Sequence, residues 1–266
     1  MQKRIAVIFD SAGTLLHMYR VAKDLNTGRM LEEIESTALV AKKPHQALVV
    51  LHSDPESILE QDPGISLIKF INDNDIAIDI SCSSSPFTIN MALDVIRKNK
   101  VSIGDLHSVL NCVTGQCPNV YYLAAGIIVD SQIDTIPYVL STGGRVFQNT
   151  PKTVKTLGEM GVDTYIASGD SMHNLRQLAK CVNIPIERVF DIATTHDKER
   201  IVLEIKKKYD TVVMVGDGIN DILALRAADV GVMTTQQGDV RPQKLKNAAD
   251  IVIKDIVEVV DIVGNL

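Results

Sequence analysis

The chain has 266 residues, of which 45% are hydrophobic, and its formal net charge is −6. This length allows one large domain or two smaller ones, and the hydrophobic fraction is sufficient for a core. The acidic balance argues against a nucleic-acid partner, because binding to a phosphate backbone needs a clustered basic surface. Every apolar run is shorter than the roughly 18 to 20 residues that cross a bilayer, so we expect no membrane partner and a cytoplasmic location.

An apolar segment near the N-terminus, residues 5–9, is the first predicted strand. It ends in Asp10, and a turn of small residues that includes Gly13 follows. A buried parallel strand that ends in this way delivers a nucleophile or a metal ligand to the edge of an α/β sheet. Asp10 is therefore the first candidate functional residue.

Residues 17–143 mix strand-like and amphipathic segments without a regular alternation. A structureless stretch of this length is not tolerated in a compact domain, so we expect an inserted α+β domain here. Its predicted strands cover residues 47–51, 76–80, 126–130 and 135–140, and its predicted helices cover residues 65–72 and 87–98.

From residue 144 onward, strand-like and helix-like segments alternate in the manner of βαβ units, which favours a parallel sheet. We therefore predict an α/β core formed by residues 1–16 and 144–266, interrupted by the insert. The predicted helices begin near Thr150 and then cover 171–181, 198–208 and 221–228, and the later strands cover 163–167, 188–192, 211–215, 230–233 and 250–253.

Three carboxylates follow apolar strands of this core: Asp10, Asp217 and Asp221. Because the carboxyl ends of parallel strands meet at one edge, these side chains are expected to gather there and to hold a hard cation such as Mg²⁺. Ser168 follows another strand, and its hydroxyl, with the backbone donors of the next helix, suits an anion. Lys198 lies in the first turn of its helix, where the positive end of the helix dipole disfavours a cation. An anionic partner would stabilise the lysine there, although an exposed lysine fits this position equally well.

Four short motifs carry a family resemblance: DSAGTL at 10–15, SGD at 168–170, HDK at 196–198 and VGDGIND at 215–221. In order and approximate spacing they resemble the motifs of the haloacid dehalogenase-like (HAD) hydrolase superfamily. VGDGIND, followed by AADVGV at 227–232, is similar to the phosphorylation domain of P-type ATPases, and the chain looks like a soluble relative of that domain. The resemblance implies a Rossmann-like core, with a parallel sheet and helices on both faces, and an inserted α+β cap.

The resemblance also implies roles for individual residues. Asp10 would be the nucleophile that becomes an aspartyl phosphate. Ser168 would hydrogen-bond the phosphoryl oxygens, and Lys198 would neutralise the charge of the transition state. Gly169 and Asn220 would complete the set that binds the substrate, a small phosphorylated molecule.

The implied cofactor is Mg²⁺. Asp10, the backbone carbonyl of Ala12 and Asp217 would hold it, with Asp221 as the remaining acidic residue of the metal site. Asp221 would also orient Lys198 and the water molecules on the metal.

Ala12 departs from the pattern of most phosphatases that the chain resembles. Those enzymes carry a second aspartate at this position, P-type ATPases carry threonine, and phosphonoacetaldehyde hydrolases carry alanine. The second aspartate protonates the leaving group and activates water, a role worth about 10²- to 10⁴-fold in rate. With Ala12 we expect a preference for good leaving groups, such as anhydrides, acyl phosphates and aryl phosphates, and slow hydrolysis of the aspartyl phosphate.

Three functions remain open from the sequence. The first is a Mg²⁺-dependent phosphatase or phosphotransferase acting on phosphate esters or anhydrides. The second is a phosphonatase-like hydrolase of carbon–phosphorus bonds, which needs a Schiff-base lysine in the cap, with Lys42 and Lys43 as the candidates. The third is a regulatory protein that binds phosphate with negligible turnover.

Overall fold

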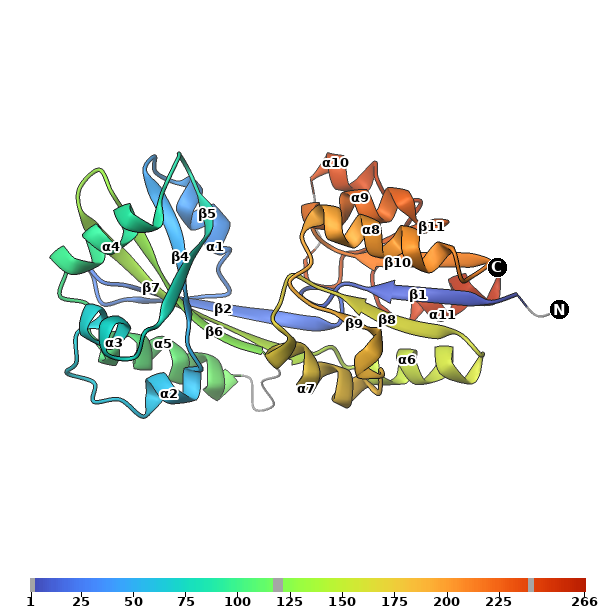
Figure 1. The fold of residues 1–266 in the computed structure, drawn as a ribbon, viewed down its shortest axis with the longest axis horizontal. Helices are drawn as coiled ribbons and strands as arrows, with labels where there is room; N and C mark the ends of the chain where they lie inside the picture. The colour runs from blue at the N-terminus through green and yellow to red at the C-terminus, as the bar shows by residue number, and fades with distance from the viewer. Residues whose placement is uncertain (1–2, 117–121, 239–241) are drawn as a thin grey trace. The chain divides into compact units, whose positions relative to one another are not determined.

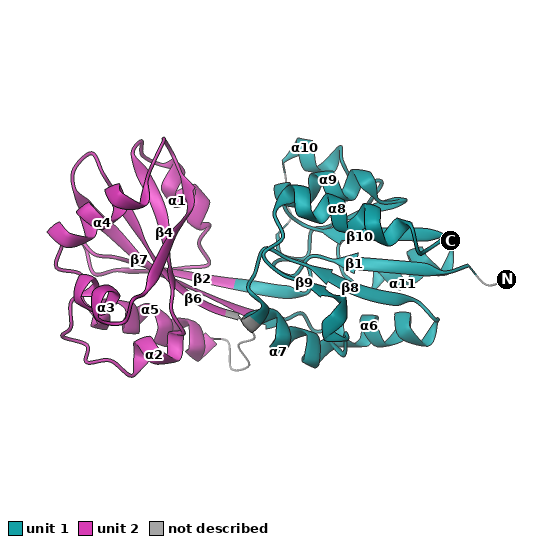
Figure 2. Ribbon diagram, in the orientation of Figure 1, with its two compact units in different colours: residues 1–18, 145–266 teal, residues 19–144 magenta. Residues whose placement is uncertain are grey.

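The structure, a computed structural model, describes residues 3–116, 122–238 and 242–266. It divides into two compact units: unit 1 comprises residues 1–18 and 145–266, and unit 2 comprises residues 19–144 (Figure 2). The chain passes between the units within two strands, β2 (Leu16–Asp24) and β7 (Thr135–Val146). The sequence prediction put the first crossing two residues earlier and the second one residue earlier. Because a strand continues through each crossing, no turn residue marks the boundary.

Unit 1 contains a six-stranded sheet in the order β12-β11-β10-β1-β8-β9, in which every neighbouring pair is parallel. Its strands are β1 (Ile5–Phe9), β8 (Asp163–Ala167), β9 (Val189–Phe190), β10 (Thr211–Gly216), β11 (Val230–Thr234) and β12 (Ile251–Ile253). All residues of β1 and β10 are buried, as expected for strands that are covered on both faces. The predicted parallel α/β core is confirmed.

Helices cover both faces of this sheet (Figure 1). One face carries α8 (Thr195–Lys206), α9 (Ile222–Ala227) and α10 (Gln243–Lys246), and the other carries α6 (Thr150–Glu159), α7 (Met172–Val182) and α11 (Glu258–Gly264). Two short 3-10 helices, η1 (Ile186–Arg188) and η2 (Ile219–Asp221), lie in the connections. Val202 and Ile205 of α8 share a core cluster with Ile8 and Met214 of the sheet, which fixes α8 against β1 and β10.

Unit 2 contains a second six-stranded sheet, in the order β3-β2-β7-β6-β4-β5. Its other strands are β3 (Met30–Glu32), β4 (Gln46–His52), β5 (Ala77–Ser83) and β6 (Tyr122–Asp130). The pairs β2–β3, β4–β5, β4–β6 and β6–β7 are antiparallel. This sheet gives unit 2 the α+β character that the sequence predicted for the insert.

The two faces of this second sheet are covered unequally. Ile127 of β6 belongs to a large core cluster with α2 (Pro55–Leu59), α3 (Leu67–Asp73), α4 (Ile89–Lys98) and α5 (Ile103–Gln116). The next residue, Ile128, points to the other face and packs with Leu39 and Val40 of α1 (Ser36–Ala41). Each unit therefore has its own core.

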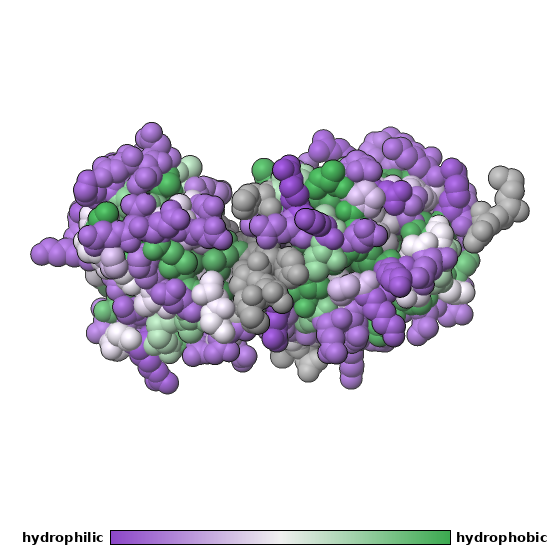
Figure 3. All heavy atoms as spheres, turned by 90° about the horizontal axis from the view of Figure 1, so that it is seen from below, coloured by the Kyte–Doolittle hydropathy of each residue, from purple (hydrophilic) through white to green (hydrophobic). Residues whose placement is uncertain are grey.

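The surface of both units is mainly hydrophilic on the face drawn in Figure 3, where hydrophobic residues are scattered. None of the described helices is long and apolar enough to cross a membrane.

Candidate active site

The pairing of β1 determines which residues meet at the carboxyl edge of the sheet in unit 1. Phe9 pairs with Val215 of β10 on one side and with Ile166 of β8 on the other. The N–H of Asp10 donates to the carbonyl of Val215 at 2.9 Å, which continues the pairing by one residue. The residues that follow the three strands are therefore neighbours at this edge: Asp10 and Ser11 after β1, Asp217 after β10 and Ser168 after β8.

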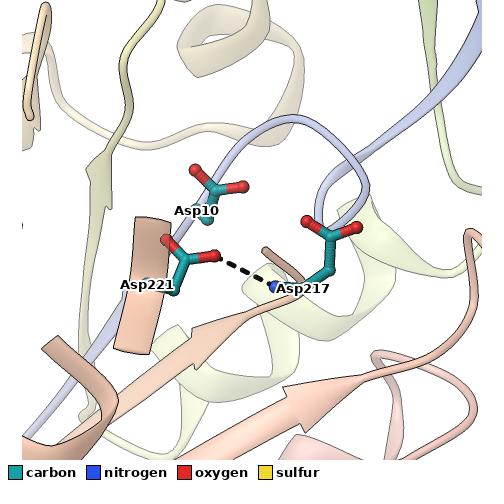
Figure 4. Close-up of side chains that lie close together, drawn as sticks. All are labelled: Asp10, Asp217 and Asp221. Atoms are coloured by element: carbon teal, nitrogen blue, oxygen red, sulfur yellow. Dashed lines mark hydrogen bonds between the residues drawn. The ribbon is translucent and has the colours of Figure 1, made fainter. Parts of the chain in front are cut away.

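Three carboxylates gather at this edge: Asp10, Asp217 and Asp221 (Figure 4). One oxygen from each lies within 4.8 Å of the corresponding oxygens of the other two. Asp221 is fully buried, Asp10 is 5% exposed and Asp217 is half-buried. Oxygen ligands in this arrangement suit a hard divalent cation.

Lys198 lies between two of these carboxylates. Its Nζ donates to Asp10 Oδ1 at 2.5 Å and to Asp221 Oδ1 at 2.7 Å, and its side chain is fully buried. The exposed lysine that the sequence left open is therefore excluded. Burial lowers the pKa of Lys198, but the two carboxylates outweigh burial and raise this pKa above its ordinary value, so the amine stays charged.

A capping box fixes the start of α8, the helix that carries Lys198. The N–H of Asp197 donates to Thr194 Oγ1 at 3.2 Å, and the Asp197 carboxylate accepts from the N–H of Thr194 at 3.1 Å. The Thr194 hydroxyl also donates to Asp197 Oδ2, at 2.6 Å, and this bond and the one from the Thr194 N–H lower the pKa of the Asp197 carboxyl. The aspartate of the HDK motif thus anchors the helix, while the lysine beside it reaches into the carboxylate cluster.

Asp221 turns back over the end of β10. Its Oδ2 accepts from the N–H groups of Asp217 at 3.2 Å and Gly218 at 2.9 Å. A Cβ at Gly216 would lie 2.6 Å from Asp221 Cγ, and one at Gly218 would lie 2.2 Å from the Oδ1 of the exposed Asn220. Both glycines of VGDGIND therefore make room for the acidic and amide side chains that follow them.

The turn after β1 approaches Asp217 through Gly13. Its φ is +80°, and a Cβ on Gly13 would lie 2.1 Å from Asp217 Oδ2. Only glycine meets both conditions without strain. Ala12, just before it, is half-buried and adds a methyl group that neither donates nor accepts a proton.

The charges of the carboxylate cluster act on one another. Burial raises the pKa of the Asp10 carboxyl well above its usual value; Lys198 opposes this increase, and Asp221 and Asp217 add to it. Each of the three carboxylates offers one oxygen within 4.8 Å of the others, and the Lys198 ammonium contacts two of them, Asp10 and Asp221. The all-oxygen donor set fits Mg²⁺.

Ser168 belongs to a second polar cluster, with Ser11 and Asp170. Ser168 Oγ lies 2.6 Å from Ser11 Oγ, and Ser11 Oγ donates to Asp170 Oδ2 at 2.6 Å. Gly169, between Ser168 and Asp170, is exposed. The sequence prediction did not include Ser11 or Asp170, although both lie inside the motifs DSAGTL and SGD.

Comparisons with known proteins indicate the family of the chain. A family model described as "Hydrolase: haloacid dehalogenase-like hydrolase" matches residues 6–229. The chain is 31% identical over 259 residues to a soluble P-type ATPase-like phosphatase of Methanocaldococcus jannaschii, a match that covers 97% of this chain and 93% of that protein. It is 25% identical over 252 residues to a copper-transporting ATPase of Helicobacter pylori, a match that covers 92% of this chain and 31% of that protein. The solved catalytic domain of the CPx-ATPase CopB-B aligns with 98% of this chain and 90% of its own length, at 17% identity and a TM-score of 0.49.

Proposed function

Because the chain belongs to the haloacid dehalogenase-like hydrolases and is a phosphatase of that family, we propose that it acts through a phosphoryl group carried on Asp10. The observation that supports this proposal is the buried contact of Lys198 Nζ with Asp10 Oδ1, at 2.5 Å, within the three-carboxylate cluster. A fixed cation beside the nucleophile offsets the charge that a phosphate brings to a carboxylate. The proposed substrate is a small phosphorylated molecule.

In the proposed reaction, a carboxylate oxygen of Asp10 attacks phosphorus, and the bond to the leaving oxygen breaks with its electron pair on that oxygen. Lys198 offsets the negative charge on the phosphoryl oxygens in the transition state. The Ser168 hydroxyl donates a hydrogen bond to one of these oxygens. Water then attacks phosphorus, the bond to Asp10 breaks with its electron pair on the carboxylate, and inorganic phosphate is released with the protons of the water.

We propose Mg²⁺ as the cofactor, held by the carboxylates of Asp10 and Asp217 and by the backbone carbonyl of Ala12. When bound, Mg²⁺ would supply positive charge that stabilises the phosphoryl oxygens. We assign Asp221 the role of orienting Lys198 rather than that of holding the metal. Its Oδ1 already accepts from this lysine, and its Oδ2 accepts from two N–H groups.

Ala12 leads to a kinetic expectation for this phosphatase. Its methyl group can neither protonate a leaving group nor take a proton from water. We therefore expect acyl and aryl phosphates to be better substrates than alkyl phosphates, and release of phosphate from Asp10 to be slow.

The test of the proposal is the turnover of p-nitrophenyl phosphate and acetyl phosphate with Mg²⁺, in the unaltered protein and in Asp10→Asn. The proposal predicts turnover that needs Mg²⁺ and is abolished by Asp10→Asn. The matched control, Asp261→Asn, changes an exposed carboxylate of α11 and should leave turnover unchanged. Undiminished turnover in Asp10→Asn would refute the role of Asp10, and the absence of turnover would favour a regulatory phosphate-binding protein.

A phosphonatase-like reaction is the second candidate, and Ala12 favours it. That reaction needs a cap lysine whose pKa is lowered by desolvation. Lys42 and Lys43 are both exposed, which argues against either one. Borohydride trapping with phosphonoacetaldehyde should label a lysine of unit 2 if this reaction occurs, and an unlabelled protein would remove this candidate.

A further inference from the structure

The cluster of Ser11, Ser168 and Asp170 contains more short contacts than protons. Ser11 Oγ lies 2.6 Å from Asp170 Oδ2, and Ser168 Oγ lies 2.6 Å from Ser11 Oγ and 3.0 Å from Asp170 Oδ2. The carboxylate only accepts, so two hydroxyl protons serve three contacts. Both of the shortest contacts are hydrogen-bonded in one arrangement: Ser11 donates to Asp170, and Ser168 donates to Ser11.

This arrangement commits the single proton of Ser168. In this arrangement the proton points to Ser11, with Asp170 Oδ2 as the alternative acceptor at 3.0 Å, and Ser168 Oγ accepts from the N–H of Asp170 at 3.1 Å. Ser11 is fully buried and Ser168 is 2% exposed, so water does not compete for these hydrogen bonds. A phosphoryl oxygen that accepts from Ser168 must therefore draw the proton away from Ser11.

We propose that Ser11 and Asp170 are positioning residues that hold the Ser168 proton away from the phosphoryl site and thereby weaken the binding of phosphate. This inference rests on the proposed function, because it takes Ser168 as a donor to phosphate. Weaker binding of inorganic phosphate favours its release at the end of the reaction. We expect Ala12 to slow the hydrolysis of the aspartyl phosphate, which precedes product release. Fast release of phosphate then keeps product release from becoming a further slow step.

The test compares the binding of orthovanadate, with Mg²⁺ present, by isothermal titration calorimetry. Ser11→Ala removes the acceptor of the Ser168 proton without changing the charge, and the remaining acceptor, Asp170 Oδ2, is farther away at 3.0 Å. We expect Ser11→Ala to bind vanadate about 3- to 10-fold more tightly, the range of one neutral hydrogen bond. Ser11→Thr keeps the hydroxyl and should bind as the unaltered protein does.

A second comparison separates positioning from a general structural effect. In a Ser168→Ala background the substitution Ser11→Ala should change vanadate affinity by less than about 2-fold, because Ser11 acts only through Ser168. Thr153→Val is the matched control, since it removes a buried hydroxyl of unit 1 that has no hydrogen-bond partner among the described residues. This control should leave vanadate affinity unchanged.

The possible results are distinct. Unchanged or weaker binding in Ser11→Ala, or the same tightening in the Ser168→Ala background, overturns the positioning role and leaves the proposed function intact. If the unaltered protein does not bind vanadate with Mg²⁺, the proposed phosphoryl site is wrong and the inference fails with it.

Discussion

Replacing Lys198 by methionine keeps an unbranched side chain that is one atom shorter, and it removes the charge. The change leaves Asp10 and Asp221 buried without the cation that lies 2.5 and 2.7 Å from them. Removing one partner of a buried ion pair costs about 3–5 kcal/mol, and here two carboxylates lose the same partner. We therefore expect Lys198→Met to lower the free energy of unfolding by about 4–5 kcal/mol at pH 7 without Mg²⁺. Turnover should fall by about 10²- to 10³-fold, the loss seen when one charge-stabilising donor is removed.

The assay for stability is urea unfolding, followed by circular dichroism at pH 7 and pH 5. Burial already raises the pKa of Asp10, and the loss of Lys198 raises it further. A carboxyl whose pKa rises on folding destabilises the folded state at any pH above its unfolded-state pKa, and does so fully above the raised value. This penalty disappears as the pH falls toward the unfolded-state pKa, so the deficit of Lys198→Met should shrink at pH 5.

Lys206→Met is the control for this prediction, because Lys206 lies on the same helix. Its Nζ is 2.7 Å from Asp229 Oδ1, but the two side chains are 32% and 36% exposed. An exposed pair of this kind contributes below about 1 kcal/mol. If Lys198→Met costs no more than Lys206→Met, or if its deficit grows at pH 5, the reasoning about the buried pair is refuted.

Three further predictions concern the turn after β1 and the nucleophile. Gly13→Ala forces a Cβ to 2.1 Å from Asp217 Oδ2 at a positive φ, so it should cost about 1–3 kcal/mol and raise the Mg²⁺ concentration needed for half-maximal activity. Gly158→Ala, at a position of α6 with open space around it, should have neither effect. Equal effects of Gly13→Ala and Gly158→Ala would contradict this account. Ala12→Asp should increase turnover of alkyl phosphates by about 10²-fold or more. If alkyl phosphates gain less than aryl phosphates do, the lack of an acid/base group at position 12 does not explain the substrate preference. Because burial raises the pKa of Asp10, kcat/KM at low Mg²⁺ should fall as the pH decreases from neutrality. Added Mg²⁺ should move this fall to lower pH. If the pH profiles at low and high Mg²⁺ coincide, the metal does not bind at Asp10.

The core fold was more predictable than the details of the insert. Apolar strands that end in functional residues, such as β1 and β10, are buried on both faces and are visible as continuous runs. The 14-residue helix α5 was not predicted, because its glycines and polar residues weaken the local helix signal. Tertiary contacts stabilise it instead, through five buried side chains: Ile103, Leu106, Val109, Leu110 and Val113.

The candidate site shows the same limit. The motifs predicted that Asp10, Asp217 and Asp221 gather, since each follows a strand end. Spacing could not reveal that Lys198 is buried, because this depends on the direction of a long side chain from α8. Nor could it reveal the pairing of Ser11 with Asp170, which are far apart in sequence; their contact follows from the register of Phe9 with Ile166.

The central claim is that the phosphoryl group is carried on Asp10. Its most direct test is to incubate the protein with acetyl phosphate and Mg²⁺, quench in acid, and locate the phosphoryl group by mass spectrometry of the peptides. The account predicts a phosphorylated peptide that contains Asp10, which accumulates because Ala12 leaves its hydrolysis slow, and which is absent in Asp10→Asn. Phosphorylation at another residue, or turnover without any phosphorylation of Asp10, would contradict the account.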